Sequence, residues 1–530
     1  MRSYYEHLAT ALGMGGVGAQ SVATKPITRS SAIFPVLNLP GIRSRILLMG
    51  YWMLKRNIPE ILAVVNLRNE KGQLLGRQTF TIKEPKTLRI ELSNQLEAAG
   101  ISPESDFRGS LEVEFFATTN LVFPFPAVVI NYYGDSFSTV VHTTQRVYND
   151  FDDMQRNSQT AVPESGFNIY ADKEREPFLA LINGPEKKEE GTIKLEFYNS
   201  MHDVLRLELP LGPMEPYETR FIFPAQECNL EDFLKGKVGA GKAHFKLNWI
   251  FPRLLVGNIH RQFPALTVTH TYYDTSKASA DSDYWKDSPP EWVPASLIVP
   301  CLLTGKHYTN VYFYPIYSPS EFILDVEIYN QEGVLLGKKK EALRLVTPEE
   351  DFHAIQLKKL AEELHISMDE PLAARINALT VEGQRLPARI KLGLDLGTSP
   401  LETPCNICTN LQPFNPALEA KPRTFRWGPV LTDQSSPMLW IMNSSTHVDY
   451  TRPAEVEITF YRERDNASLM RKFTLPPHGF RVIYPNEDPE LRLFFEGEIG
   501  WFTLISTNPY TTTYYFAENK SGLIGGDHGF

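Results

Sequence analysis

Two short motifs combine residue types that bind metals or transfer protons. The first, Cys405-Asn-Ile-Cys408, places two thiols three residues apart, which is the spacing of half a zinc site or of a redox pair. Cys301 lies at the start of the same repeat, described below, and is a candidate third ligand because the first and last strands of a sandwich can lie close together. No second CxxC and no HxxxH motif accompanies these cysteines, so we favour incidental thiols in a strained loop over a zinc or redox site.

The second motif lies at the end of the chain, where Asp527 and His528 follow two glycines. A carboxylate beside an imidazole could bind a metal or shuttle a proton. The first repeat contains a loose echo of this pair in Asp135 and His142. Adjacent residues of an extended chain point to opposite sides, which weakens the hypothesis. We therefore favour a tail that packs Phe530 against a neighbouring domain, with zinc as the minor alternative and no other cofactor.

Aromatic residues form two groups that could contact a ligand. Exposed rings stack on sugar faces or anchor protein interfaces. The alternative, which we favour, is that alternate residues of each group fill the core of a sandwich. The candidates are Tyr272, Tyr273, Tyr284 and Trp285 near one linker, and Tyr514 and Tyr515 near the end of the chain.

The sequence lacks the local signatures of several enzyme classes: a GxGxxG after a strand, a P-loop, a GxSxG and an HExxH motif. No sequence spacing pairs two carboxylates as acid and base across a sugar. The 53 basic and 63 acidic residues give a net charge of -10, which predicts no nucleic-acid partner. We find no apolar leader and no apolar run long enough to span a bilayer, so we expect a cytoplasmic protein, with non-classical export as an alternative.

Composition predicts an all-β chain. The 39 prolines outnumber the 33 glycines, and aromatic residues make up 12% of the sequence. Proline is tolerated at strand edges and in turns but breaks the interior of a helix. A length of 530 residues suggests three or four domains, at about 150 residues each.

An internal repeat settles that number at four. Gly76 and Gly337 end two similar hairpin sequences that are 261 residues apart, which is twice 130.5. Related strand sequences occur near the expected intermediate and final positions. Their anchors are Arg68, Tyr198, Tyr329 and Tyr461, with spacings of 130, 131 and 132 residues.

A second set of strand sequences supports the same period. These alternating segments begin at Thr87, Thr219, Phe352 and Phe480. In the first three copies, leucines three or four residues apart predict a short helical turn directly afterwards. The fourth copy has Pro485-Asn-Glu-Asp-Pro489 instead, and we expect that it has lost the helix.

Each repeat contains six to eight short alternating segments, which resembles an immunoglobulin-like antiparallel β-sandwich in architecture only. The Cys…Trp…Cys pattern of true immunoglobulin domains is absent. The predicted units are a flexible arm over 1–30 and sandwich repeats over 31–150, 165–275, 290–410 and 424–530.

A sandwich scaffold does not specify chemistry, so function must come from its surfaces and clefts. The sequence favours a non-enzymatic binding or assembly protein that uses sandwich surfaces and inter-domain clefts. Its partner would be a polysaccharide or other glycan, or another protein. The alternative is a carbohydrate-active enzyme with a site at a domain junction.

Overall fold

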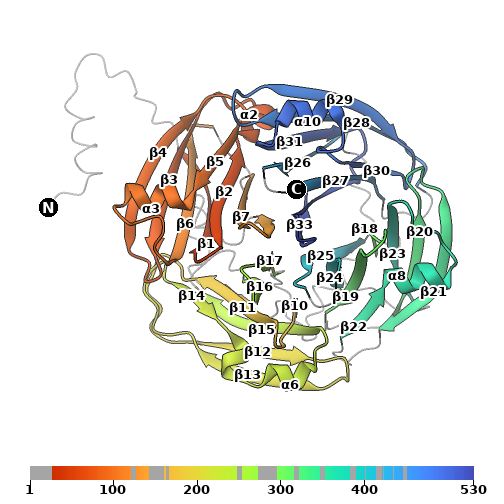
Figure 1. Cartoon of the computed structure of the whole chain (residues 1–530), viewed down its shortest axis with the longest axis horizontal. Helices are drawn as coiled ribbons and strands as arrows, with labels where there is room; N and C mark the ends of the chain where they lie inside the picture. The colour runs from red at the N-terminus through yellow and green to blue at the C-terminus, as the bar shows by residue number, and fades with distance from the viewer. Residues whose placement is uncertain are drawn as a thin grey trace, which may run out of the picture.

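The computed structural model contains four antiparallel β-sandwiches arranged in a ring (Figure 1). This confirms the all-β fold of four immunoglobulin-like repeats. The structure describes residues 27–119, 121, 127–142, 160–162, 166–247, 254–271, 295–314, 321–345, 352–381, 390–399, 402–413, 421, 423–433, 435–445 and 450–529.

The first repeat shows the plan that the others follow. Its first sheet has the strand order β1-β6-β3-β4, and its second sheet has the order β5-β2-β7-β8. In β3, Ile61, Ala63, Val65 and Leu67 are buried, as expected when successive side chains point to opposite faces. The strands are β1 (Thr28–Asn38), β2 (Arg43–Met49), β3 (Ile61–Asn69), β4 (Leu74–Ile82), β5 (Thr87–Glu91), β6 (Phe107–Ala117), β7 (Val128–Tyr133) and β8 (Ser138–His142).

The second repeat has the sheets β10-β15-β12-β13 and β14-β11-β16-β17, and β9 also pairs with β15. Two of its strands, β16 and β17, form the hairpin that reaches the centre of the ring (Figure 1). Its strands are β9 (Thr160–Val162), β10 (Gly166–Ile169), β11 (Arg175–Ile182), β12 (Thr192–Tyr198), β13 (Val204–Pro210), β14 (Thr219–Ile222), β15 (Gly239–Leu247), β16 (Leu255–His260) and β17 (Leu266–His270).

The third repeat differs in that its two sheets are joined. Pairing of β18 with β25 produces one eight-stranded sheet, β21-β20-β23-β18-β25-β24-β19-β22. Its strands are β18 (Ala295–Cys301), β19 (Tyr308–Phe313), β20 (Phe322–Tyr329), β21 (Leu335–Leu345), β22 (His353–Gln356), β23 (Leu372–Thr380), β24 (Ile390–Gly397) and β25 (Cys405–Pro413).

The fourth repeat returns to two separate sheets, β26-β31-β28-β29 and β30-β27-β32-β33. Its strands are β26 (Thr424–Leu431), β27 (Ser436–Asn443), β28 (Ala454–Arg462), β29 (Ser468–Leu475), β30 (Phe480–Ile483), β31 (Ile499–Ser506), β32 (Thr511–Glu518) and β33 (Ile524–His528).

The fourth repeat also keeps the helix that its sequence was expected to have lost. This helix is α10, and it begins at Pro489. Proline suits the first position of a helix, where no backbone N–H is needed. The Asp488 side chain caps the same end by accepting hydrogen bonds from the N–H groups of Glu490 and Leu491. The proline that suggested a break therefore starts the helix.

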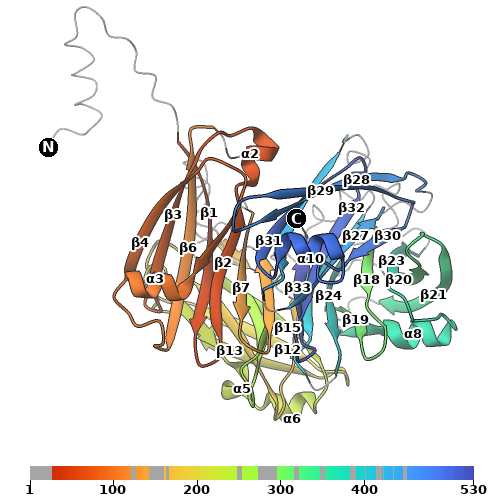
Figure 2. The ribbon, with the colours of Figure 1, turned by 45° about the horizontal axis from the view of Figure 1, so that its top comes forward.

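Short helices occur at equivalent places in all four repeats, and each buries hydrophobic residues against its own sandwich. Figures 1 and 2 place α3, α6, α8 and α10 on the four sides of the ring, away from its centre. The helices are α2 (Tyr51–Arg56), α3 (Leu92–Ala98), α5 (Pro224–Glu227), α6 (Leu230–Leu234), α8 (Leu357–Glu363) and α10 (Pro489–Phe495).

Two of the junctions between neighbouring repeats contain equivalent hydrogen bonds. The N–H of Thr219 in the second repeat donates to the carbonyl of Glu70 in the first, at 2.8 Å. The N–H of Phe480 in the fourth repeat donates to the carbonyl of Gln331 in the third, at 3.0 Å. Thr219 and Phe480 are 261 residues apart, and so are Glu70 and Gln331, so the two contacts follow the sequence repeat.

The ring is closed between the fourth and first repeats. The Arg45 guanidinium, which is almost fully buried, lies 2.7 Å and 3.2 Å from the two Asp433 carboxylate oxygens. Its Nε donates to Asn131 at 2.8 Å. One hydrophobic core cluster includes residues of the first and fourth repeats together. The two ends of the repeat array are therefore joined by packing and by a buried ion pair.

The last strands of the four repeats meet at the centre of the ring (Figure 1). β8 contacts β33 and β17, and β25 contacts the same two strands. Residues far apart in the sequence are thereby brought into one small region. The ends of these four strands therefore form a candidate functional site.

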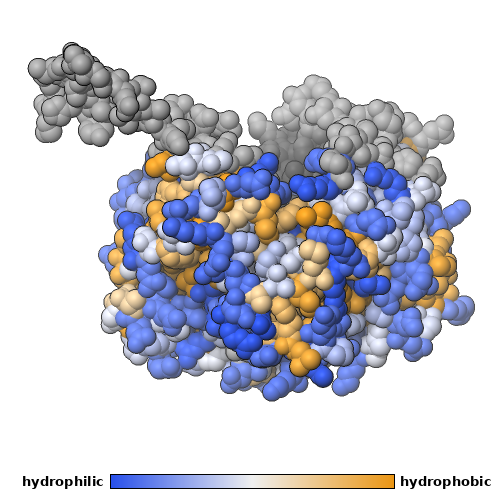
Figure 3. All heavy atoms as spheres, turned by 90° about the horizontal axis from the view of Figure 1, so that it is seen from above, coloured by the Kyte–Doolittle hydropathy of each residue, from blue (hydrophilic) through white to orange (hydrophobic). Residues whose placement is uncertain are grey.

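Figure 3 shows hydrophilic and hydrophobic residues interspersed on the face it presents. β1 begins at Thr28, inside the segment assigned to the arm, and β25 extends to Pro413, beyond the predicted end of the third repeat. In the part of the chain that the structure describes, no helix has the length and apolar character needed to cross a membrane.

Candidate functional site

Three of the four central strands end in a histidine. These residues are His142 on β8, His270 on β17 and His528 on β33. Together with Asp527 they form the central cluster, in which one potential ligand atom of each residue lies within 4.8 Å of those of the others. The His142 ring centroid lies 4.3 Å from that of His270 and 4.7 Å from that of His528, and the latter two are 6.0 Å apart.

The three histidines share a position in the β ladders. Each pairs with a residue of the penultimate strand, which in turn pairs with a residue of the strand beside it. The rows are His142–Val129–Leu47, His270–Leu255–Ala180 and His528–Tyr514–Trp440. Equivalent register in three repeats therefore delivers three imidazoles to the centre.

A glycine allows the last strand to approach the first repeat closely. A Cβ added at Gly525 would lie 1.9 Å from the Ser138 carbonyl oxygen on β8. No side chain fits in that space, so glycine is needed for β33 to pack beside β8. Asp527 and His528, two and three residues later, are brought to His142 by this approach.

Hydrogen bonds orient the rings of the cluster. The Asp527 Oδ2 atom lies 2.7 Å from Nδ1 of His142 and accepts from the His142 backbone N–H at 2.9 Å. Nδ1 of His270 lies 3.2 Å from the Thr271 carbonyl oxygen. Nδ1 of His528 lies 3.4 Å from the Gly529 carbonyl oxygen. Each Nδ1 atom is therefore directed to an oxygen acceptor.

Part of this cluster was predicted from the sequence. Asp527 and His528 were candidates, and His142 was noted as an echo of them. Although they are adjacent in an extended strand, Asp527 and His528 both reach His142. His270 was missed, although its spacing could have revealed it: it follows His142 by 128 residues and precedes His528 by 258, which is twice 129.

The cysteines do not belong to the central cluster. Cys301, Cys405 and Cys408 are all buried, and none of the three forms a disulfide. The thiol of Cys405 lies 3.7 Å from the Gly526 carbonyl oxygen, and that of Cys408 lies 4.0 Å from the Gly166 carbonyl oxygen. Burial raises the pKa of Cys301 and of Cys405, which disfavours the thiolate form that binds metals.

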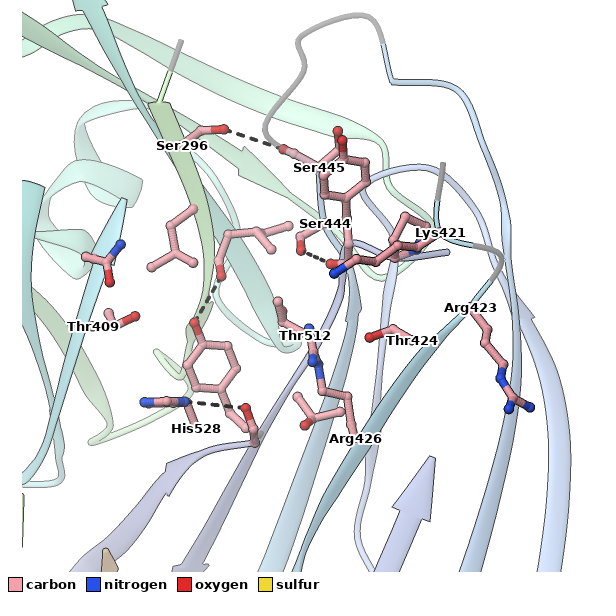
Figure 4. Close-up of a pocket in the computed structure, with 18 residues that line it drawn as sticks. Ser296, Thr409, Lys421, Arg423, Thr424, Arg426, Ser444, Ser445, Thr512 and His528 are labelled. Atoms are coloured by element: carbon pink, nitrogen blue, oxygen red, sulfur yellow. Dashed lines mark hydrogen bonds between the residues drawn. The ribbon is translucent and has the colours of Figure 1, made fainter. Parts of the chain in front are cut away.

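A cleft of about 390 Å³ adjoins the central cluster, between the third and fourth repeats. His528 and Gly529 form part of its wall. Hydroxyl groups are abundant, and Figure 4 shows Thr409 and His528 on the side opposite Thr424 and Lys421. The described lining consists of Ser296, Leu297, Ile298, Thr409, Asn410, Lys421, Arg423, Thr424, Arg426, Ser444, Ser445, Pro509, Tyr510, Thr512, Thr513, Tyr514, His528 and Gly529.

The described lining of this cleft carries three cationic side chains and no carboxylate. Arg426 on β26 is half-buried, and its Nε donates to the Thr511 carbonyl at 2.9 Å. Burial lowers the pKa of Arg426 to about 10. Lys421 extends toward the interior in Figure 4, whereas Arg423 lies at the outer side.

The positive charge extends to the first repeat. Burial, followed by repulsion from Arg56, Arg426 and Lys421, lowers the pKa of Lys55 to about 8. The Lys55 ammonium lies 5.4 Å from the centre of the Phe425 ring. The cleft therefore lies near several cations, and their mutual repulsion already disfavours the protonated form of Lys55.

The aromatic candidates lie in different environments. Tyr514 and Tyr515 on β32 are both buried, so neither is an exposed stacking platform. Tyr514 lines the cleft, and its hydroxyl donates to the Ile298 carbonyl at 3.2 Å. Tyr515 packs in the hydrophobic core shared by the first and fourth repeats. The other candidates, Tyr272, Tyr273, Tyr284 and Trp285, lie outside the described residues, as does Phe530.

A buried carboxylate lies between the second and third repeats. Asp395 accepts hydrogen bonds from the Tyr170 hydroxyl, from Asn168 Nδ2 at 3.0 Å and from Asn406 Nδ2 at 2.6 Å. Burial raises its pKa, and the three hydrogen bonds offset part of that effect. Because Tyr170 and Asn168 belong to the second repeat and Asn406 to the third, Asp395 joins these two repeats.

No protein-family model and no curated protein matches the chain. Among solved structures, a glycosyl hydrolase family 2 member from Bacteroides cellulosilyticus DSM 14838 is 8% identical. That alignment covers 94% of this chain and 91% of the other, with a TM-score of 0.12. A likeness of this size shows neither the fold nor the function of the chain.

Proposed function

We propose that this chain is a binding protein whose cleft between the third and fourth repeats takes an acidic saccharide without chemical turnover. One observation carries the proposal: the described lining contains Lys421, Arg423 and Arg426 but no aspartate or glutamate. A half-buried guanidinium without a nearby carboxylate is costly, and an anionic ligand offsets that cost.

The remaining lining suits a ligand with many hydroxyl groups. Serine and threonine hydroxyls both donate and accept hydrogen bonds, and the Asn410 amide does the same. Tyr510 and Tyr514 also line the cleft, but both rings are buried, so the polar groups carry the recognition. The volume of about 390 Å³ falls within the range of small-ligand sites, roughly 300–1,000 Å³.

The same lining supports binding over hydrolysis. Glycosidases usually need two carboxyl groups that flank the scissile bond, one as acid and one as base or nucleophile. Neither is present among the residues that the structure describes around this cleft. We keep the carbohydrate-active enzyme as the alternative that the experiment must exclude.

Calorimetric titration with two trisaccharides of equal length tests the proposal: trigalacturonate, which is acidic, and a neutral galactose trimer. We expect saturable binding of the acidic probe that weakens as salt is added, and at least tenfold weaker binding of the neutral one. Arg426→Met and the more exposed Lys421→Met should each weaken binding of trigalacturonate about tenfold. Arg344→Gln is the matched control, because Arg344 is an exposed arginine on β21 that pairs with Glu321 and Glu341.

Two outcomes would overturn this proposal. Equal affinity for the acidic and neutral probes would remove the role of the cations, as would full affinity in both the Arg426→Met and Lys421→Met variants. Release of reducing sugar by the wild type but not by these variants would establish the enzymatic alternative.

The pH dependence provides a further check. An anion bound near Lys55 should raise the pKa of this residue from about 8, so that the protein takes up protons on binding at pH 8 and almost none at pH 6. Titration in two buffers with different ionisation enthalpies measures this uptake. Equal apparent heats in both buffers at pH 8 would show that the ligand does not reach Lys55.

A further inference from the structure

We propose that a zinc ion binds at the centre of the ring through the Nε2 atoms of His142, His270 and His528. Asp527 positions His142 rather than binding the metal. This site goes beyond the proposed saccharide cleft and stands on separate residues, except that His528 lies at the wall between them.

The separations between the rings fit a shared ion. Three imidazoles bound tetrahedrally at a Zn–N distance of about 2 Å have ring centres about 5 Å apart. The observed separations of 4.3, 4.7 and 6.0 Å lie on both sides of that value. The rings meet edge to face, with interplanar angles of 70° to 76°, instead of stacking. One potential ligand atom of each ring also lies within 4.8 Å of those of the others, a separation that leaves the three rings within reach of a single ion.

The hydrogen bonds of the three rings indicate which nitrogen carries the proton. A backbone carbonyl can only accept, so His270 and His528 place their protons on Nδ1. The carboxylate beside Nδ1 of His142 selects the same tautomer. In each ring the Nε2 lone pair is then the one that can bind a metal, as in sites where a histidine donates its other N–H to a carbonyl or carboxylate.

Asp527 is already held by donors on both of its oxygens. Its Oδ2 accepts from Nδ1 and from the backbone N–H of His142. Its Oδ1 accepts from the backbone N–H of His528 at 2.8 Å. This arrangement fixes the His142 ring and places one negative charge beside the metal, which reduces the cost of burying a divalent ion.

The donor set indicates the class of metal. Three neutral imidazoles suit zinc and other late divalent transition ions better than calcium or magnesium, which prefer oxygen ligands. Zinc accepts the tetrahedral arrangement without a preference of its own, and three protein ligands leave its fourth position to water or a small ligand. The three histidines come from the first, second and fourth repeats, so the ion would join three parts of the ring.

Metal analysis of the untagged full-length chain tests the site. After removal of bound metal with a chelator, we expect one equivalent of zinc to bind and to raise the melting temperature. His270→Ala should weaken zinc binding at least 100-fold, and His270→Gln provides a near-isosteric second variant if the alanine variant does not fold. His260→Ala is the matched control, since His260 is a buried histidine of the same repeat that stacks on Phe263.

Substitution of Asp527 separates its role from that of the ligands. Asp527→Asn should weaken zinc binding about 10- to 100-fold without abolishing it. Loss as complete as in the His270 variants would show that Asp527 is itself a ligand and would overturn the role assigned to it. Failure of the wild type to retain one equivalent at micromolar zinc, or full affinity in a folded His270 variant, would overturn the site.

Discussion

The last strand of the third repeat differs from its three counterparts at one ladder position. β8, β17 and β33 carry histidine there, whereas the corresponding row of the third repeat is Cys408–Gly393–Tyr312. The row is identified by its neighbours: it adjoins the row of Ile355, just as the histidine row of the first repeat adjoins that of Ile90. This position therefore holds a histidine in three repeats and a cysteine in the other one.

The surroundings of Cys408 show what the third repeat has instead. Cys408 belongs to a hydrophobic cluster between the second and third repeats that includes Tyr312, Tyr314 and Phe352. A shared register therefore fixes the position of the side chain in each repeat. The contacts with the neighbouring repeat determine whether that side chain packs in a hydrophobic cluster or makes polar interactions.

Loss of packing on the cysteine side should have the largest effect on stability. Phe352 is buried and stacks on Tyr312 with ring centres 5.5 Å apart. Phe352→Ala should lower the free energy of unfolding by about 3–5 kcal/mol, because it removes a large buried ring and leaves a cavity. Denaturant unfolding measures this loss. Zinc stoichiometry should stay unchanged, and a matching loss of zinc would break the distinction between the two sides.

The buried carboxylate on the same side should produce a pH-dependent effect. Because the pKa of Asp395 is raised in the folded state, the folded chain retains this proton at pH values where the unfolded chain has lost it. Its contribution therefore makes stability fall as pH rises from about 4 through the folded pKa, by at most about 1.4 kcal/mol per pH unit. Asp395→Asn should remove this contribution. Unfolding curves between pH 4 and 8 provide the test, and an unchanged slope would contradict it.

On the histidine side, Tyr514 pairs with His528 and hydrogen-bonds to the third repeat. Tyr514→Phe removes the hydroxyl and leaves the Ile298 carbonyl without that donor. We expect the free energy of unfolding to fall by about 1 kcal/mol. Chemical denaturation measures the change, and the zinc affinity should be within threefold of the wild type if the ring alone supports His528.

The smallest effect is expected from removal of the two thiols of β25. Cys405→Ala and Cys408→Ala delete groups that lie against backbone carbonyls and outside the central cluster. Bound zinc should remain at the wild-type level in each variant, as measured by elemental analysis. A drop in zinc content would indicate that the cysteines, and not the histidines, bind the metal. It would contradict the distinction between the cysteine side and the histidine side.

The sequence allowed the four tandem repeats to be predicted, but not their arrangement in a closed ring. Strand anchors such as Thr219 and Phe480 revealed the period because alternation and spacing are local signals, and the same residues make the contacts between repeats. The prediction that the fourth repeat lacks the helix was wrong because Pro489 was interpreted as a helix breaker, although proline also begins helices.

The candidate site was only half visible in the sequence for a different reason. Asp527 and His528 stood out because they are adjacent, whereas His270 has no chemical neighbour in its own strand. His270 is brought to the cluster by the arrangement of the repeats in a ring, which no local sequence pattern indicates. The cationic cleft was missed although Lys421, Arg423 and Arg426 lie within six residues of one another, because the sequence does not show that this segment faces the third repeat across a cleft.

Closure of the ring through Arg45 and Asp433 has a consequence for how the molecule comes apart. A linear array of repeats exposes a face at each end and needs terminal units to cover it. Here the first and last repeats cover each other. Unravelling cannot start at a free end, because releasing any repeat opens two junctions at once, so the four sandwiches should lose their structure as a single cooperative body.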